Sequence, residues 1–293
     1  MIFQLFSIIA PVFFIAAAGF AWARLGYEYN TAIITRLLTN LTTPCLVFSR
    51  MTGLDFPLSQ FGEIAFITLA ATLVWATVGY VSLSATGIPR DSGLPPILFP
   101  NCGNMGLAIC LFAFGDEGLG MGLCFFVTTA TLQFTISPWL ASGHFSLVAM
   151  LREPIIYATL LAVAVMALKL EVPVWLSNTT TLLGNVSIPM MLITLGVSLA
   201  GYGITNFRNS LIVSILRLGV GFGSGMLLVW LFDIDGMMRG VVLVMCSMPA
   251  AVFNYLFAQR YGKNGEEVAG TVILSTAMAF VLLPFLMMFV LEG

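Results

Sequence analysis

Long apolar runs, separated by short polar segments, occupy almost the whole sequence. Most of them approach the roughly 20 residues that a helix needs to cross the hydrocarbon core of a membrane. The pattern predicts ten membrane-spanning helices, at residues 3–23, 31–50, 61–84, 93–114, 118–141, 153–169, 174–200, 208–232, 236–259 and 266–291. The expected fold class is therefore an all-α polytopic membrane protein, with loops too short to form a soluble domain.

Composition leads to the same class. Of the 293 residues, 59% are hydrophobic and only 8% are charged, whereas a soluble domain carries about 25% charged residues. The formal net charge of −2 gives no indication of nucleic acid as a partner. The first apolar run lacks the basic segment that opens a secretory signal, so we interpret it as an uncleaved first span. We expect a multi-pass protein of the plasma (inner) membrane, surrounded by lipid.

The basic residues of the loops set the expected orientation, because cytoplasmic loops carry an excess of lysine and arginine. The loops after odd-numbered spans hold seven of these residues: Arg24, Arg36, Arg90, Arg152, Arg208, Arg260 and Lys263. The loops after even-numbered spans hold three: Arg50, Lys169 and Arg239. This asymmetry places the odd-numbered loops, including the central connection 142–152, in the cytoplasm, and both termini on the extracytoplasmic side.

Residue types that support catalysis or metal binding are scarce. The five cysteines all fall in apolar runs, form no Cys-x-x-Cys pair and are interpreted as small hydrophobic side chains. The single histidine, His144, lies in a predicted loop, which excludes a histidine-based metal or catalytic cluster. We therefore expect neither a cofactor nor enzymatic activity.

Proline positions indicate an internal repeat. Three pairs of prolines occupy matching places within their spans: Pro44 with Pro189, Pro100 with Pro249, and Pro138 with Pro284. Their separations of 145, 149 and 146 residues are close to half of the chain. Each half, 1–146 and 147–293, would hold five spans, and an odd number makes the second half enter the membrane from the opposite side. The sequence thus predicts two inverted repeats, an architecture of many secondary transporters.

The stretch FPNCGNMGLA, residues 99–108, is an unusual apolar segment. Pro100 has no N–H and clashes with the carbonyl four residues earlier, and Gly103 lowers the cost of unwinding, so this span should open near its centre. Opened backbone groups at membrane depth must face protein, water or a ligand. The amides of Asn101 and Asn104, together with the positive end of a half-helix, would bind an anionic group.

A matching interruption is expected at Pro249 in the ninth span, with Asn254 five residues beyond it. Inverted-repeat transporters bind their substrates near mid-membrane, between interrupted helices of the two halves. We therefore predict five substrate-binding residues: Asn101, Gly103, Asn104, Pro249 and Asn254. The alternative is a pair of proline kinks whose asparagines bond neighbouring helices.

Polar residues in the second and seventh spans also have two interpretations. They line a cavity, or they bond neighbouring helices to one another: Thr35, Thr39, Asn40, Thr42, Thr43, Thr179, Asn185, Ser187, Thr194 and Ser198. Arg217, about ten residues into the eighth span, is either functional or extends to the cytoplasmic surface. Asp and Glu side chains are not placed in the middle of a span, so we expect no strict requirement for a proton gradient.

Several stretches resemble the auxin efflux carrier family, which includes the plant PIN-FORMED carriers and bacterial permeases. FPNCGNMGLAICLFAFGDEGLG (99–120) resembles the family's fourth span, SIPMMLITLGVSLA (187–200) its seventh, and residues 248–289 its last two. The family is similar in fold to bile acid sodium symporters. This resemblance implies ten helices in two inverted repeats, with spans 4 and 9 broken and crossing. It further implies a scaffold of spans 1, 2, 6 and 7 beside a mobile core.

The resemblance also implies transport of small organic anions, among them auxin and carboxylates such as malonate. We expect a secondary transporter or facilitator that moves a carboxylate or auxin-like acid across the membrane by alternating access. Carbonyls and amides at the breaks are suitable ligands for sodium, so a sodium-coupled organic anion symporter is an alternative. A membrane ligand sensor that does not transport is another. A homodimer through the scaffold helices stays open as well.

Overall fold

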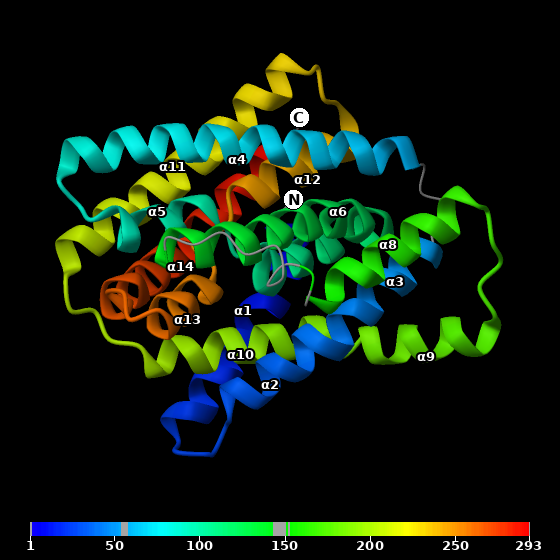
Figure 1. Ribbon diagram of the computed structural model, residues 1–293, viewed down its shortest axis with the longest axis horizontal. Coiled ribbons are helices and arrows are strands. Elements are labelled where there is room, and N and C mark those ends of the chain that lie inside the picture. Colours follow the sequence, from blue (N-terminus) through cyan, green and yellow to red (C-terminus); the bar gives the residue numbers. More distant parts are fainter. Residues whose placement is uncertain (1, 54–57, 143–150, 152, 293) are drawn as a thin grey trace.

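The computed structural model describes residues 2–53, 58–142, 151 and 153–292. Within these ranges the long elements are all helices (Figure 1): α1 (Ile2–Arg24), α2 (Thr31–Leu37), α3 (Thr43–Gly53), α4 (Leu58–Thr86), α5 (Arg90–Leu98), α6 (Leu107–Ser142), α8 (Pro154–Ala167), α9 (Val174–Gly184), α10 (Ser187–Gly201), α11 (Phe207–Leu231), α12 (Gly236–Cys246), α13 (Val252–Arg260) and α14 (Gly265–Glu292). Two π-helical turns, η1 (Leu38–Thr42) and η2 (Cys102–Gly106), interrupt this series. The all-helical fold class is therefore confirmed. His144, with most of the predicted central connection, lies outside the described residues.

Seven segments of the described chain are long and apolar enough to cross a membrane: Leu5–Arg24, Thr31–Gly53, Leu58–Thr86, Cys102–Ser137, Val174–Gly201, Phe207–Leu231 and Gly265–Leu291. This number is lower than the ten expected because two expected spans form shorter helices and two others are joined in one long helix. The expected spans at 153–169 and 236–259 appear as the shorter apolar helices Pro154–Ala167 and Gly236–Cys246, the latter followed by a break. The protein is a multi-pass membrane protein.

The expected loop between the fourth and fifth spans is absent as a separate connection. Instead α6 continues through a sharp kink at Gly115, which has φ 70° and ψ −158°. A left-handed backbone of this kind is readily adopted only by glycine, because a Cβ atom would strain it. The two expected spans therefore follow one another as the two arms of one kinked element.

The helices pack in two groups. In the first, α1 packs along α10, and α3 packs against both α8 and α9. In the second, α4 packs on α5, α6 and α11, while α11 also packs on α12 and α14, and α13 packs on α14. In Figure 1, α4 runs across the upper part of the view, α9 and α10 run across the lower part, and α5, α6 and α14 lie between them.

Small residues allow the closest helix contact in the first group. A Cβ atom at Gly196 of α10 would collide with the carbonyl of Ala16, and one at Gly19 of α1 would collide with the carbonyl of Ile193. Glycine at both positions lets the two backbones touch, which is a common way of packing helices in a membrane.

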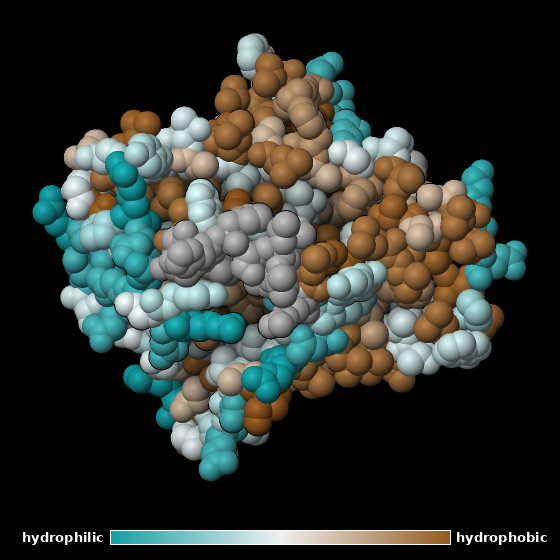
Figure 2. Space-filling view, in the orientation of Figure 1, coloured by the Kyte–Doolittle hydropathy of each residue, from teal (hydrophilic) through white to brown (hydrophobic). Residues whose placement is uncertain are grey.

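Large apolar side chains cover much of the outer surface, as lipid contact requires. Phe3, Leu73, Leu182 and Trp230 are each exposed by more than 65% and lie on four different helices. Figure 2 shows hydrophobic residues over the upper part and the right of this face, with hydrophilic residues gathered at the left and below the centre and a smaller number at the right edge. The hydrophobic surface therefore faces lipid.

The burial of Arg217 decides between the two interpretations of this residue. Its side chain is 0% exposed and points into the interior from α11. The interpretation that it extends to the cytoplasmic surface is therefore wrong. A guanidinium group can be buried at this depth because two main-chain carbonyls and an aromatic ring surround it.

Candidate functional site

Both predicted helix interruptions are present, and they meet. The peptide N–H of Asn101 donates to the carbonyl of Pro249 over 2.6 Å, and that of Ala251 donates to the carbonyl of Phe99 over 3.0 Å. These bonds form an isolated antiparallel β-bridge between Pro100 and Ala250. Backbone groups released by the two breaks thus satisfy one another inside the protein, as a membrane interior demands.

Local sequence explains where the helices stop. Proline disfavours the helical conformation of the residue before it, and Phe99, directly before Pro100, is extended with φ −119° and ψ 97°. Helix α5 therefore ends at Leu98. In the second half, α12 ends at Cys246, shortly before Pro249, and the chain becomes helical again at Val252.

The helical segments that restart after each break begin at this crossing. Asn101 caps η2, because its side-chain oxygen accepts from the N–H of Asn104 over 3.3 Å. Its amide nitrogen is buried and has no partner among the described residues. Ala251 is the N-cap of α13 and supplies no side-chain cap. Both restarting helices thus present their N-terminal, partially positive ends here.

Three neighbouring cavities lie beside the crossing. A small one of about 30 Å³ is lined by both breaks, including Asn101, Gly103 and Ala251. It shares Asn104 and Gln133 with a second cavity of about 50 Å³. Each is large enough for only a few water molecules. The second shares lining residues with a wide vestibule of about 680 Å³, which is open to the outside of the protein.

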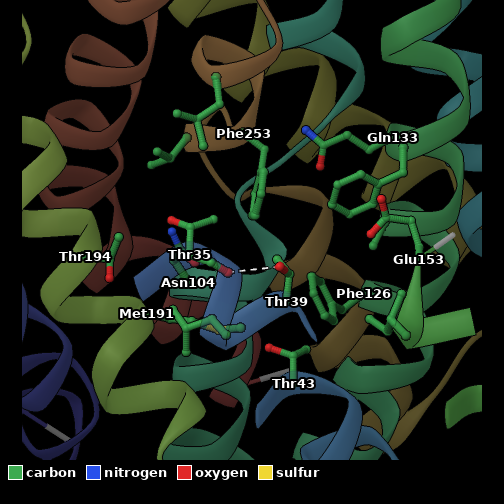
Figure 3. A pocket seen from close by; sticks show the side chains of 16 residues that line it. Thr35, Thr39, Thr43, Asn104, Phe126, Gln133, Glu153, Met191, Thr194 and Phe253 are labelled. Carbon is green, nitrogen blue, oxygen red and sulfur yellow. Dashed lines mark hydrogen bonds between the residues drawn. The ribbon is translucent and has the colours of Figure 1, made fainter. Parts of the chain in front are cut away.

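The second cavity lies between the two packing groups. Thr35, Thr39 and Thr43 reach it from α2, η1 and α3, and Met191 and Thr194 reach it from α10. From the other group come Asn104 of η2, Phe126 and Gln133 of α6, and Phe253 of α13. Figure 3 shows these side chains around the cavity, with Glu153 at its edge.

The structure brings three of the five predicted residues to the cavities. Asn101, Gly103 and Asn104 all line the smallest one, and Asn104 also lines the second. There is little room for a side chain at Gly103, because a Cβ atom there would lie 2.8 Å from the ring of Phe126. The break therefore stays close to the aromatic wall of the cavity.

The other two predicted residues, Pro249 and Asn254, do not line the inner cavities and instead hold the two breaks in place through hydrogen bonds. The carbonyl of Pro249 accepts the bridge hydrogen bond from Asn101. Asn254 is 1% exposed; its amide nitrogen donates to the carbonyl of Phe99 over 3.1 Å, and its oxygen accepts from Gln133 over 3.0 Å. Asn254 thus ties the first break to α6.

Some of the polar residues in the second and seventh spans line a cavity, and another bonds neighbouring helices to one another. Thr35, Thr39, Thr43 and Thr194 line the second cavity. Asn185 instead accepts a hydrogen bond from Arg50 over 3.2 Å and so joins two helices of the first group.

Sequence reasoning missed two polar residues of the site, Gln133 and Glu153. Gln133 is a lone amide in an apolar run, and that signal was available in the sequence. Glu153 directly precedes α8, and only the fold reveals that it lines both the second cavity and the vestibule. Burial raises the pKa of its carboxyl group above the ordinary value, and the nearby positive charge of Arg260 partly offsets this.

The arrangement suits a small anion better than a metal ion. The crossing offers two helix N-termini and the amides of Asn101 and Asn104, all of which donate to negatively charged oxygen atoms. Among the described residues, no group of three or more His, Cys, Asp or Glu side chains is placed to hold a metal ion.

The sequence profile of a family described as membrane transport protein matches residues 135–287, slightly more than half of the chain. The chain belongs to this family, which is that of the auxin efflux and PIN-FORMED carriers, so the resemblance found in the sequence is confirmed. It is a membrane transport protein, and the members of its family are transporters rather than enzymes. A comparison with curated proteins finds no match.

Proposed function

We propose that the protein is a secondary transporter or facilitator that moves a small organic anion, a carboxylate or auxin-like acid, across the membrane by alternating access. One observation carries the proposal: the N-terminal ends of two interrupted helices meet beside a cavity that the amide side chains of Asn101 and Asn104 also line. Helix N-termini and amide N–H groups attract carboxylates without a charged side chain in the site.

The proposed architecture is ten spans in two inverted repeats, 1–146 and 147–293. Inverted repeats make span 1 equivalent to span 6, and span 2 equivalent to span 7. The packing of α1 on α10, span 1 on span 7, then has its counterpart in α3 on α8, span 2 on span 6. Likewise α4 on α6 has its counterpart in α11 on α14. This exchange of partners supports a two-fold relationship between the halves.

The matched interruptions support the same relationship. Pro100 and Pro249 each follow a short half-helix and precede the restart of a helix. Pro44 lies just after the π-helical turn η1, and Pro189 lies just after the short gap between α9 and α10. Each interruption in the first half thus has a counterpart in the second.

Alternating access is supported by the position of the cavity. Its walls come from two helix groups, so a displacement of one group relative to the other would open and close it. The first group, containing α1, α3, α8, α9 and α10, is the proposed scaffold, and the second is the proposed mobile core. The inner cavities are nearly closed while the vestibule is wide, as expected for one end of a transport cycle.

The vestibule also bears on sidedness. Its wall includes Ala23 at the end of the first span, Thr31 and Arg36 at the start of the second, Gly201 directly after the seventh and Gln259 at the end of the ninth. The loop charges assign the connections at all these span ends to the cytoplasm. We therefore propose that this conformation opens to the cytoplasm, with both termini on the other side of the plasma (inner) membrane.

Uptake into proteoliposomes tests the function. Purified protein is reconstituted, and labelled carboxylates, auxin-like acids and amino acids are screened, with protein-free liposomes as the negative control. Saturable uptake of at least one organic anion is expected. If a labelled acid binds the folded protein without entering any liposome, the chain is a ligand sensor and the transport proposal is wrong.

A further inference from the structure

Arg217 is a buried charge with unusual partners. It is the eleventh residue of α11, about 15 Å along the helix axis from Phe207. A charge buried at this depth needs compensation. Both ion pairs found among the described residues involve other side chains. The guanidinium group of Arg217 instead donates to two main-chain carbonyls, from Nη1 to Ile97 and from Nη2 to Cys246.

Those two carbonyls occupy matching places in the fold. Ile97 lies in the last turn of α5, and Cys246 is the last residue of α12. Carbonyl groups at a helix C-terminus lack intrahelical partners and carry partial negative charge. One guanidinium group therefore neutralises the C-terminal ends of both half-helices that stop at the crossing.

The surroundings are shaped for this group. The guanidinium carbon of Arg217 lies 4.5 Å from the ring centroid of Trp75, within cation–π distance. The indole N–H of Trp75 donates to Ser224 over 2.7 Å, which holds the ring in place. A Cβ atom at Gly221 would collide with both the guanidinium group and the carbonyl of Cys246. The planar donor fork of arginine suits two acceptors that come from different helices.

We infer that Arg217 is a cation, covalently part of the chain, that holds the two half-helices together at the crossing. It takes the place that a dissociable cation occupies in other transporters. In transporters with interrupted helices, sodium or protons are coordinated by unwound carbonyls and by half-helix C-termini. Here the guanidinium group already occupies these acceptors. Arg217 is thus a positioning residue, and the crossing needs no sodium ion.

One consequence of this inference rests on the proposed function: substrate movement should be independent of a sodium gradient. The structural part is testable without transport. Four of the five cysteines are buried, so a thiol-reactive fluorescent dye reports unfolding of the full-length protein in detergent. The wild-type melting temperature should be the same in sodium, potassium and choline chloride at equal ionic strength.

Two variants test the role of the guanidinium group. Arg217→Ala should lower the melting temperature by about 5 °C or more, and low-millimolar guanidinium chloride should restore part of the loss, whereas choline chloride should not. Arg217→Lys should fall between the two, because an ammonium group keeps the charge but loses the fork. Arg208→Ala, at an exposed arginine of the same helix, is the matched control and should melt like the wild type.

Sodium-specific stabilisation of the wild type would overturn the inference, and so would an Arg217→Ala protein that melts like the Arg208→Ala control. If Arg217→Ala does not fold, the wild-type cation series and the lysine variant decide the question. In proteoliposomes, replacing sodium by choline should leave wild-type uptake unchanged, and uptake that requires sodium overturns the inference. Failure of the transport proposal would appear differently, as no uptake in any salt.

Discussion

Replacing Asn104 by alanine should weaken substrate binding while leaving the fold intact. Asn104 is 9% exposed, and it is the predicted residue that lines both inner cavities. Its backbone N–H bonds to Asn101, and this bond survives in the alanine variant. Asn104 lines the cavity (Figure 3), where a carboxylate would accept a hydrogen bond from its side-chain amide.

The expected size follows from the charge of the acceptor. A hydrogen bond to a charged group contributes roughly 1.5–3 kcal/mol, and about 1.4 kcal/mol corresponds to a tenfold change in the dissociation constant. Asn104→Ala should therefore raise the dissociation constant roughly tenfold to a hundredfold. A neutral substrate group would give a smaller effect, because an ordinary hydrogen bond contributes only about 1 kcal/mol.

The assay is equilibrium binding of the labelled acid found in the uptake screen, measured on purified protein. Asn178→Ala is the matched control, since Asn178 lies exposed on α9 and outside the cavities. Leu107→Ala is a poorer control because Leu107 is fully buried and its loss would leave a cavity. Melting curves establish that each variant is folded.

An unchanged dissociation constant for Asn104→Ala would refute the assignment. The breaks would then serve only to kink the helices, as the alternative interpretation of the asparagines holds, and the anion would bind elsewhere. A loss of affinity accompanied by an equal loss in Asn178→Ala would also argue against a local effect at the crossing.

Three further predictions concern charge, packing and topology. Below its raised pKa the carboxyl group of Glu153 is neutral, so an anion should bind more tightly as the pH falls through that pKa. Glu153→Gln should abolish this pH dependence of binding. An unchanged pH profile in the variant would contradict a role of Glu153 in anion binding. Gly196→Ala should destabilise the protein by about 1–3 kcal/mol, measured by thermal melting, whereas Gly201→Ala, in open space, should not. Reporter fusions at residues 143 and 293 should give a cytoplasmic and an extracytoplasmic signal, respectively, and a cytoplasmic signal at both positions would rule out five spans in the second half.

Local backbone chemistry made the interruptions predictable. Proline disfavours the helical conformation of the residue before it, and Pro100 and Pro249 indicate the breaks on this local ground, although Pro11 and Pro284 lie inside continuous helices. The cap formed by Asn101 is local for the same reason, because its partner lies three residues away. By contrast, the apolar runs do not reveal that the expected fourth and fifth spans are joined in one helix, α6, through the kink at Gly115.

The remaining parts of the site depend on contacts between distant residues. Asn254 was predicted to face the substrate, but Gln133, 121 residues away, and Phe99, 155 residues away, take up its amide. Glu153 lines the cavity only because α8 packs beside η1 and α6. No pattern within a span encodes such neighbours. The sequence therefore predicted the breaks themselves better than the walls of the cavity around them.

The crossing also indicates how the proposed anion would be bound, although Arg217, the one fully buried arginine of the described residues, is unavailable to it. The guanidinium group of Arg217 is committed to two carbonyls, so the substrate is left with helix N-termini and neutral amides as donors. Such donors bind a carboxylate without the strong ion pair that would retain it, and Glu153 at the cavity edge disfavours long occupancy when charged. Easy release is what a transporter requires and a high-affinity sensor does not, so this distribution of charge favours transport over sensing.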